Sequence, residues 1–324
     1  MSYYCTLFDS FYLSRGLVMI NSLQKHASNF HLYVFAFDNI AYDILIDLKL
    51  ENITVISIRD FETPELLAVK EERSKAEYYW TSTPAVIKYV FSKYRVTNCT
   101  YVDADLMFYD DPSVLLSELK SNTTVLITEH RYSFLERIYE EKRAGKFCVQ
   151  FITFNDLQES QLILDTWANQ CLEWCYNKYE DGKFGDQKYL DEWPFIYNNV
   201  HILENEGGGV APWNIKNYIF TGHKNEIIII RRKTRKSYKL IFFHFQNLKI
   251  KHNYVFDLGW HYINKKIRNL IYKDYISRIS NVEKMLTSKN KNYSTSYFYP
   301  VNNSIKDLIK NSFKGFTGYN TYKL

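Results

Sequence analysis

The sequence contains no run of about 18 uninterrupted apolar residues, so it predicts no helix that spans a membrane. Its first ten residues, MSYYCTLFDS, lack the basic start and the apolar stretch of a signal peptide, and we interpret them as a first core strand. No repeat period and no low-complexity tract occurs along the 324 residues. We therefore expect a soluble globular protein with one large domain, or with one domain and an appendage.

Cysteine is sparse, and its five copies are odd in number and lie mostly in apolar segments. Cys171 and Cys175 are spaced by one helical turn, which would suit a metal pair, but no matching pair of His or Cys lies near them in the sequence. We therefore expect reduced core thiols in a cytosolic protein rather than a disulfide framework.

Acidic residues are nearly absent from the last third of the chain. Residues 223–324 carry 21 Lys+Arg and only 5 Asp+Glu, a net charge of +16, whereas residues 1–222 carry 20 and 31, a net charge of −11. The net charge of the whole chain, +5, hides this step. A step of this size indicates a functional boundary between an acidic and a basic part.

Apolar strand-like runs alternate with helical patterns up to about residue 155. Such alternation predicts an α/β fold with a mostly parallel sheet covered by helices on both faces, which binds ligands at the carboxyl ends of its strands. The predicted strands are residues 3–8, 31–37, 53–58, 99–104, 124–128 and 147–154, and the predicted helices between them are residues 12–27 and 81–94.

Two amphipathic helices are predicted later in the chain. The first, residues 158–178, presents Leu162, Leu164, Trp167, Cys171, Trp174 and Cys175 on its packing face. In the second, apolar residues recur at spacings of three and four, and lysines and arginines occupy other positions. The apolar residues are Ile263, Ile267, Ile271, Tyr275, Ile279, Val282 and Leu286. Short strands are predicted at 226–230 and 239–245. We expect a catalytic domain over residues 1–256 and a basic helical extension over residues 257–324.

Two carboxylates, Asp103 and Asp105, follow an apolar run in the segment CTYVDADLMFYDDP. On extended backbone residues i and i+2 point to one face, so we expect both carboxylates to face the same side at the strand end. Like charges this close repel unless a cation or a proton separates them, and Mg²⁺ or Mn²⁺ prefers such oxygen ligands. Turn and cap chemistry, the alternative, fits Asp110 and Asp111 before a proline better than it fits Asp103.

A second set of polar residues lies at the end of the predicted fold. His244 ends an apolar run in KLIFFHFQNLK and could complete a metal shell, although most histidines in such places are satisfied core residues. Lys249 could then face a diphosphate, although an exposed lysine after a strand is common. The segment GGGVAPWN concentrates three of the eleven glycines and predicts a binding loop, with a plain loop as the alternative. Within it, Trp213 could stack on a sugar ring and Asn214 could bind hydroxyl groups.

Six segments in a fixed order resemble nucleotide-diphospho-sugar glycosyltransferases of the GT-A fold, in a bacterial branch similar to glycosyltransferase family eight. They are CTLFDSFYLSRGLVMINSL, EYYWTSTPAVIKYVF, YVDADLMFYDDP, FGDQKYLDEWP, GGGVAPWN and FFHF, over about residues 3–250. The resemblance implies an α/β GT-A fold with a doubly wound mixed sheet, followed here by the basic helical extension. It also implies a metal-dependent sugar transferase in which Asp103, Asp105 and His244 hold Mn²⁺ or Mg²⁺ on the donor diphosphate.

The same resemblance assigns roles to residues around the metal. Asp186 would orient donor hydroxyls or act at the reacting centre, and Gln187 would lie under the anomeric carbon; without the family, Gly-Asp there predicts only a helix N-cap. Thr6, Phe8 and Asp9 would lie near the nucleotide base. The full set expected at the donor is Thr6, Phe8, Asp9, Thr83, Lys88, Ala104, Gly208, Gly209, Trp213, Asn214 and Lys249.

Two segments depart from the family pattern. Val86 stands where an arginine that contacts the donor is expected, and Lys88 keeps a basic group one turn on. The segment FCVQFITF lacks the Asn-Ala-Gly common there, which leaves the acceptor side and the stereochemical outcome open.

We therefore predict a glycosyltransferase that moves a sugar from a nucleotide-diphosphate donor, UDP-linked, to a glycan or lipid-linked acceptor in cell-surface polysaccharide biosynthesis. Two alternatives stay open. A doubly wound phosphatase also uses Asp-X-Asp, but its motif normally opens the chain and Thr or Val usually stands where Met107 lies here. A silent relative would bind a sugar nucleotide without turnover.

The basic C-terminal helix predicts contact with an anionic membrane surface, and hence a cytoplasmic protein peripherally associated with the inner membrane face. Nucleic acid is not the expected partner, because the aromatic residues of this segment follow helical spacing. Packing of the helix onto the catalytic domain, with solvated lysines, is the alternative.

Overall fold

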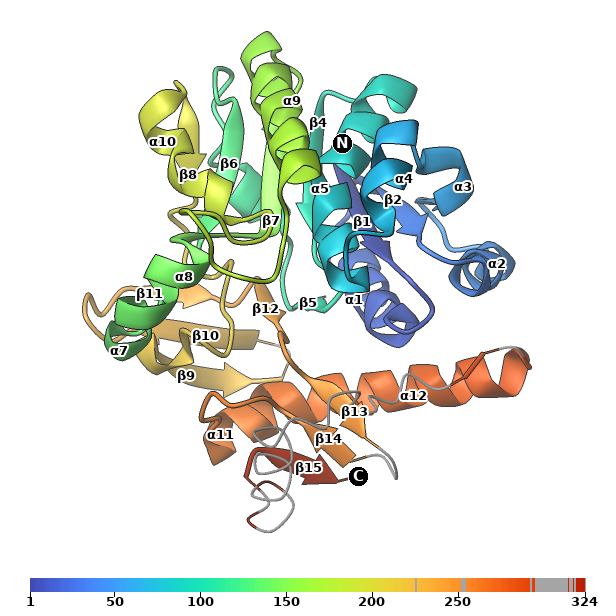
Figure 1. Cartoon of the computed structure of the whole chain (residues 1–324). Coiled ribbons are helices and arrows are strands. Elements are labelled where there is room, and N and C mark those ends of the chain that lie inside the picture. The colour runs from blue at the N-terminus through green and yellow to red at the C-terminus, as the bar shows by residue number, and fades with distance from the viewer. Residues whose placement is uncertain are drawn as a thin grey trace.

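The computed structural model of the protein describes residues 1–224, 226–251, 255–291, 293, 294, 314, 317 and 319–323. At its centre is a seven-stranded sheet with the strand order β3-β2-β1-β4-β7-β6-β8 (Figure 1). The strands are β1 (Ser2–Phe8), β2 (Phe30–Ala36), β3 (Ile53–Ser57), β4 (Asn98–Val102), β6 (Val125–Glu129), β7 (Phe147–Asn155) and β8 (Val200–Ile202).

The sheet is mixed because β7 runs antiparallel to its two neighbours. Strands β3, β2, β1 and β4 are parallel, whereas β7 runs antiparallel to both β4 and β6. A parallel partner of β6 would need a crossover helix over a sheet face. Residues 130–146 instead form short turns, α7 (Phe134–Glu136), the π-helical η1 (Arg137–Glu141) and α8 (Lys142–Ala144). The expected mixed, mostly parallel sheet is confirmed, because β7 is the one strand of this sheet that runs against the others.

Both faces of the sheet are covered because alternate strand residues point to opposite sides. Tyr4 and Phe8 of β1 pack with α1 (Leu13–His26), while Cys5 and Leu7 pack with α5 (Lys75–Tyr94). The other helices beside the sheet are α2 (Asn39–Leu48), α3 (Ile58–Phe61), α4 (Pro64–Lys70), α6 (Ser113–Leu116), α9 (Gln158–Glu173), η2 (Lys188–Asp191) and α10 (Trp193–Ile196). All five cysteines are buried and unpaired, as predicted.

Three smaller sheets extend the central one. A two-stranded ladder joins β5 (Leu106–Phe108) to β12 (Phe242–His244) and so connects two segments far apart in the sequence. The others are β9 (Tyr218–His223), β10 (Glu226–Arg231) and β11 (Ser237–Lys239), which follow η3 (Ile215–Asn217), and β13 (Lys249–Lys251), β14 (Val255–Asp257) and β15 (Thr321–Lys323).

The predicted basic amphipathic helix is present as α11 (Lys265–Ile267), η5 (Arg268–Tyr272) and α12 (Lys273–Lys289). Its predicted apolar face is buried throughout and packs into the main core together with residues of the central sheet and α1. The rings of Phe245 and Tyr275 stack with centroids 3.6 Å apart and planes within 7°. The helix therefore packs on the domain, and its apolar face does not lie open to lipid.

Two details of the predicted helices differ from the structure. The helix predicted over 158–178 ends at Glu173, and Leu162, which we expected on its packing face, is 59% exposed. Its neighbour Ile163 fills the core position instead.

None of the described helices is both long and apolar enough to cross a bilayer. The division of the chain at residue 256 stays a prediction.

Replacing Ile279 by alanine tests the packing of α12. Ile279 is fully buried in the main core, so Ile279→Ala is expected to lower the free energy of unfolding by about 2–4 kcal/mol. Lys284→Ala, at an exposed position of the same helix, is expected to change it by less than about 0.5 kcal/mol. Urea denaturation measures both, and equal stability of the two variants would contradict the packing.

Candidate functional site

The two aspartates of the Asp-X-Asp segment lie in a tight turn between β4 and β5. Strand β4 ends at Val102, and the N–H of Leu106 donates to the carbonyl of Asp103 at 3.3 Å. The expected extended backbone through Asp105 is therefore wrong, and the turn geometry that we judged a poor fit for Asp103 is present there. The turn itself brings the two carboxylates to one side at the carboxyl edge of the sheet.

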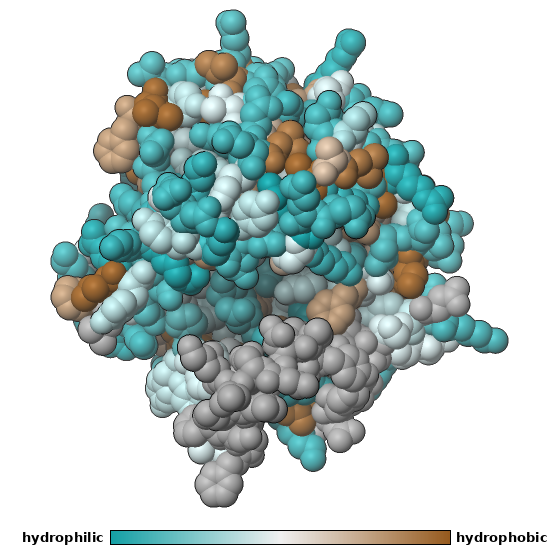
Figure 2. All heavy atoms as spheres, viewed as in Figure 1, coloured by the Kyte–Doolittle hydropathy of each residue, from teal (hydrophilic) through white to brown (hydrophobic). Residues whose placement is uncertain are grey.

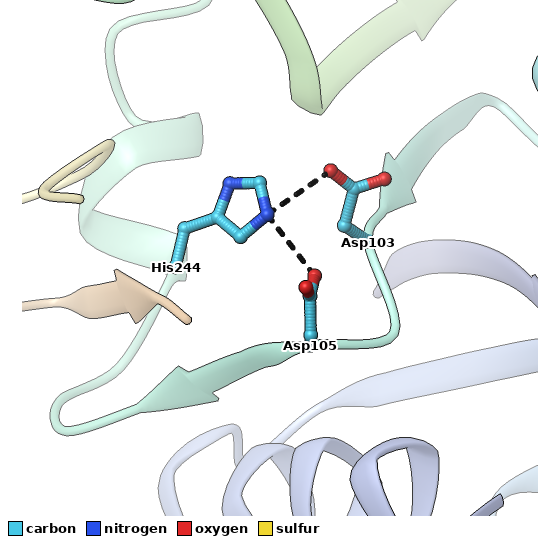
Figure 3. A group of neighbouring side chains, drawn as sticks. All are labelled: Asp103, Asp105 and His244. Carbon is cyan, nitrogen blue, oxygen red and sulfur yellow. Dashed lines mark ion pairs between the residues drawn. The ribbon is translucent and has the colours of Figure 1, made fainter. Parts of the chain in front are cut away.

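His244 meets both carboxylates, as the sequence and the family resemblance predicted. Its position follows from the β5–β12 ladder, which pairs His244 with Leu106, and from the N–H of Phe245, which donates to the carbonyl of Asp105 at 3.0 Å. The Nε2 atom lies 3.0 Å from Asp105 Oδ1 and 3.7 Å from Asp103 Oδ2 (Figure 3). One potential ligand atom from each residue lies within 4.8 Å of the others.

Gln150 of β7 orients the imidazole from the other side. Its Oε1 lies 2.8 Å from His244 Nδ1, so assigning the Nδ1 hydrogen to this bond leaves the Nε2 lone pair facing the aspartates. The ring of Trp213 packs edge-on against the imidazole at 5.3 Å. Sequence analysis did not select Gln150; the signal was present as one long polar side chain inside the buried run FCVQFITF.

The charges of the three groups are strongly coupled. Burial raises the pKa of Asp103 to about 6; repulsion from Asp105 adds to this rise and attraction to His244 opposes it. Burial also opposes the charged forms of Asp105 and His244, but their mutual attraction outweighs it, lowering the pKa of Asp105 and raising that of His244 well above its usual value. The buried guanidinium of Arg15 adds a further attraction to Asp105.

Two carboxylates and one oriented imidazole form a donor set that fits a divalent cation. Carboxylate oxygens suit Mg²⁺ and Mn²⁺, and a histidine whose second nitrogen is fixed by a hydrogen bond is typical of metal sites. Asp103, Asp105 and His244 could therefore hold a metal ion, and such an ion would relieve the repulsion between the two half-buried acids.

Asp186 lies close enough to this group to feel its charge. Burial, followed by repulsion from Asp103, raises the pKa of Asp186 to about 8, with a hydrogen bond from Thr83 opposing the rise. The main-chain carbonyl of Asp186 accepts from Trp167 Nε1 at 2.9 Å, which fixes the loop. Gln187 points instead to α8, where its Nε2 donates to the carbonyl of Ala144 at 2.6 Å.

The residues expected near the nucleotide base lie at the end of β1. Asp9 accepts from the hydroxyl of Tyr79 at 2.8 Å and pairs with Lys75. The hydroxyl of Thr6 is buried and has no partner among the described residues. The ring of Phe8 packs on Gly16 of α1, where an added Cβ would lie 2.5 Å from it, so its side chain belongs to the core. Ala104 is buried between the two aspartates of the turn.

The glycine-rich loop is a scaffold for His244 rather than a sugar platform. Gly209 has φ +78°, and an added Cβ would lie 2.7 Å from Arg131 Nη2, so both its backbone and its surroundings require glycine. Trp213 is only 4% exposed and donates from Nε1 to the carbonyl of His130 at 2.8 Å. The Asn214 amide donates to the carbonyls of His130 and Gly209 at 2.8 and 2.9 Å. We correct the sugar-stacking and hydroxyl-binding roles, because the ring and both amide hydrogens are already engaged. Gly208 packs against Leu115 and Leu203.

The two lysines expected at the donor, Lys88 and Lys249, differ in their surroundings. Lys88 Nζ pairs with Asp165 Oδ1 of α9 at 2.7 Å, so the structure does not bring it to the three metal-site residues. Lys249 begins β13 and is half-buried, directly after Leu248, whose carbonyl accepts a 3.4 Å hydrogen bond from Arg15. Arg15 therefore connects the loop after His244 to the side of Asp105.

Removing the partner of His244 Nδ1 tests the metal site. Gln150→Leu keeps the size of the side chain but removes the acceptor, and we expect the affinity for Mn²⁺ to fall by about 10–100-fold. Titration calorimetry measures the affinity, and Gln161→Leu, on the outer side of α9, is the matched control. Equal Mn²⁺ affinity in Gln150→Leu and the control would refute this orienting role.

The raised pKa of Asp186 predicts a pH-dependent stability. The folded protein keeps a proton that the unfolded chain releases between the usual pKa of 3.8 and about 8, so the stabilisation by this group is complete below 3.8 and is lost as the pH rises to 8. The Asp186→Asn variant has no such proton to lose. Its free energy of unfolding, relative to that of the unmodified protein, should therefore rise by on the order of 1 kcal/mol per pH unit between these two pH values. Urea unfolding in EDTA measures it, with exposed Asp181→Asn as control; a difference independent of pH would contradict the prediction.

Comparison with known proteins identifies relatives of similar length. The sequence matches none of the known family models. YfnD of Bacillus subtilis (strain 168), described as uncharacterized, is 30% identical over 279 residues, which cover 85% of this chain and 87% of YfnD. YfnF of the same organism, likewise described as uncharacterized, is 28% identical over 256 residues, which cover 77% of this chain and 82% of YfnF.

Solved structures show the fold. The galactosyltransferase LgtC, in complex with donor and acceptor sugar analogues, superimposes with a TM-score of 0.57 at 13% identity, over 89% of this chain and all of that chain. The glycosyltransferase GlyE of Streptococcus pneumoniae TIGR4 superimposes with a TM-score of 0.50 at 14% identity, and the match covers 91% of this chain and 65% of the GlyE chain. The architecture is thus the mixed α/β fold of GT-A glycosyltransferases. From its identity to YfnD along most of both chains, we conclude that the protein belongs to the YfnD family.

Proposed function

We propose that the protein is a metal-dependent glycosyltransferase that uses a nucleotide-diphosphate sugar, most simply a UDP-sugar. The observation that carries the proposal is the convergence of Asp103, Asp105 and His244 at the carboxyl edge of a GT-A-type sheet. Ligands of such sheets bind at this edge, beside the point where the strand order reverses between β1 and β4.

The three residues would hold a divalent ion beside the donor diphosphate. Bound there, Mn²⁺ or Mg²⁺ would supply positive charge that stabilises the departing nucleoside diphosphate. The protein contributes the geometry of the site: the turn holds the aspartates, the β5–β12 ladder brings His244 to them, and Gln150 fixes the ring.

Asp186 is the best-placed group for contact with the donor sugar. Its pKa of about 8 keeps it mostly protonated at neutral pH, so its carboxyl group can both donate to and accept from sugar hydroxyls. Thr83 of α5, whose hydroxyl donates to the carbonyl of Tyr79 at 3.2 Å, lies beside it. Gln187 would act here only after releasing the carbonyl of Ala144. Thr6 and Asp9, at the end of the neighbouring strand, would face the nucleotide base.

The acceptor we propose is a glycan or a lipid-linked oligosaccharide in cell-surface polysaccharide biosynthesis, at the inner membrane face. LgtC, which shares the fold, was solved with donor and acceptor sugar analogues. Because the apolar face of α12 is buried, the exposed side chains of this helix are polar, and Lys273, Lys284 and Lys289 are the basic ones among them.

A sugar-nucleotide screen tests this function. Melting temperature should rise with one donor and Mn²⁺ together more than with either alone, because the ligand binds only the folded state. With that donor, turnover in Mn²⁺ should fall by roughly 10²–10³-fold in Asp105→Asn, because charge stabilisation at the diphosphate is lost.

Asp110→Asn is the matched control for this screen, since Asp110 lies five residues on and pairs with Lys239 outside the site at 3.4 Å. Turnover should be unchanged in it. Full turnover in Asp105→Asn would overturn the proposal, and release of phosphate from simple phosphate esters would point to the phosphatase alternative instead.

A further inference from the structure

The segment after β6 exposes a group of large apolar side chains. Phe134, Ile138 and Tyr139 of α7 and η1 are 79%, 57% and 75% exposed. Phe134 and Ile138 are four residues apart and so lie on one side of the helical turns, and Tyr139 follows Ile138 directly. Figure 2 shows brown, hydrophobic side chains at the left edge of the molecule, where Figure 1 places α7. Such a group on a surface commonly marks an interaction site.

Glu136 connects this segment to two distant parts of the chain. Its Oε1 lies 3.0 Å from His261 Nδ1 and 3.4 Å from Lys216 Nζ. The first contact places Tyr262, which is 60% exposed, beside α7. Aromatic and aliphatic side chains from residues 134–139 and 260–262 thus share one region of the surface.

Basic residues border the same region. The turn between β10 and β11 carries Lys233, Arg235 and Lys236, all exposed, and none of the three forms an ion pair with another described residue. Arg232 Nε donates to the carbonyl of Lys216 at 3.0 Å, which places this turn next to Glu136. Residues 215–240 contain eight Lys+Arg and one acidic residue, Glu226, at the opposite end of the hairpin.

The acidic side chains of η1 do not offset this charge. Glu141 pairs with Arg137 at 2.9 Å, and Glu140 pairs with Arg143 at 2.5 Å. Glu136 is engaged by Lys216 and His261. The net charge of the region is therefore positive beside its exposed apolar group.

We infer that this region, formed by Phe134, Ile138, Tyr139, Tyr262 and the basic turn 232–236, docks on an anionic membrane. Aromatic and aliphatic side chains enter the interface between headgroups and acyl chains, and lysines and arginines attract anionic headgroups. A soluble polyanion would use the basic turn but gain nothing from the exposed apolar side chains. The combination favours a lipid surface.

The docking region is connected to the catalytic centre by a short path. Segment α7 begins four residues after His130, whose carbonyl accepts from Trp213, and Trp213 packs on His244. An acceptor carried by a membrane lipid would thus be presented beside the metal site. This inference deepens the proposed function, and it rests on that function for the identity of the acceptor. It also moves the contact away from α12, whose apolar face is buried.

Sedimentation of the full-length protein with vesicles tests the inference. We expect binding to vesicles of phosphatidylcholine mixed with phosphatidylglycerol and none to phosphatidylcholine alone. The triple variant Lys233→Gln, Arg235→Gln, Lys236→Gln should bind roughly tenfold or more weakly, because each basic residue adds to the attraction. The double variant Phe134→Ser, Tyr139→Ser should also bind more weakly.

The matched control removes three charges from the exposed face of α12, Lys273→Gln, Lys284→Gln, Lys289→Gln, and should bind as the unmodified protein does. Circular dichroism confirms that each variant folds. No sedimentation with anionic vesicles, full binding by the turn variant, full binding by the apolar variant, or loss only in the α12 variant would each overturn the inference. Donor turnover in solution should be equal in all four proteins, so failure of sedimentation and failure of sugar transfer are separate results.

Discussion

The repulsion between two half-buried carboxylates, Asp103 and Asp105, constrains much of this structure. Both lie in one tight turn, and their partial removal from water weakens the screening of such charges. His244 relieves the repulsion, but it comes from a strand about 140 residues later. The β5–β12 ladder is the device that brings it there, and the last part of the domain must fold back onto the central sheet for the site to exist.

The surroundings of His244 show why that late segment has its composition. Gln150 contacts the imidazole at Nδ1, and the ring of Trp213 packs edge-on against it. The main-chain N–H of His244 donates to the carbonyl of Val210, which fixes the backbone at this position. Val210 lies in the glycine-rich loop, where Gly209 allows a backbone conformation that other residues rarely adopt. The loop thus serves the site through its backbone and packing, since the side chains of Trp213 and Asn214 are already bonded to main-chain groups of the loop and of His130.

Sequence reasoning predicted the parts of this site that depend on local pattern. The strands and helices around the central sheet follow from apolar periodicity, and Asp103 and Asp105 were selected because acids at a strand end suit a cation. His244 became the favoured third ligand only through the family resemblance. Periodicity does not report strand direction, so the reversal of β7 was missed. The turn at Asp103 and the role of Gln150 depend on contacts between strands that are distant in sequence. Exposure of Trp213 and Asn214 likewise depends on neighbours that a single sequence does not reveal.

The C-terminal helix shows a further limit of pattern. An amphipathic sequence reports that one face is covered, but protein and lipid cover an apolar face equally well. Here the covering is protein, because Tyr275 stacks on Phe245 and the remaining apolar positions enter the main core. A membrane contact must then use apolar side chains that the fold leaves exposed. Phe134, Ile138 and Tyr139 of the short turns α7 and η1 are such side chains, and they lie near the basic turn 232–236. Among the basic residues of the last third of the chain, we therefore assign the membrane contact to the turn 232–236, which lies beside those apolar side chains, and not to the lysines of α12.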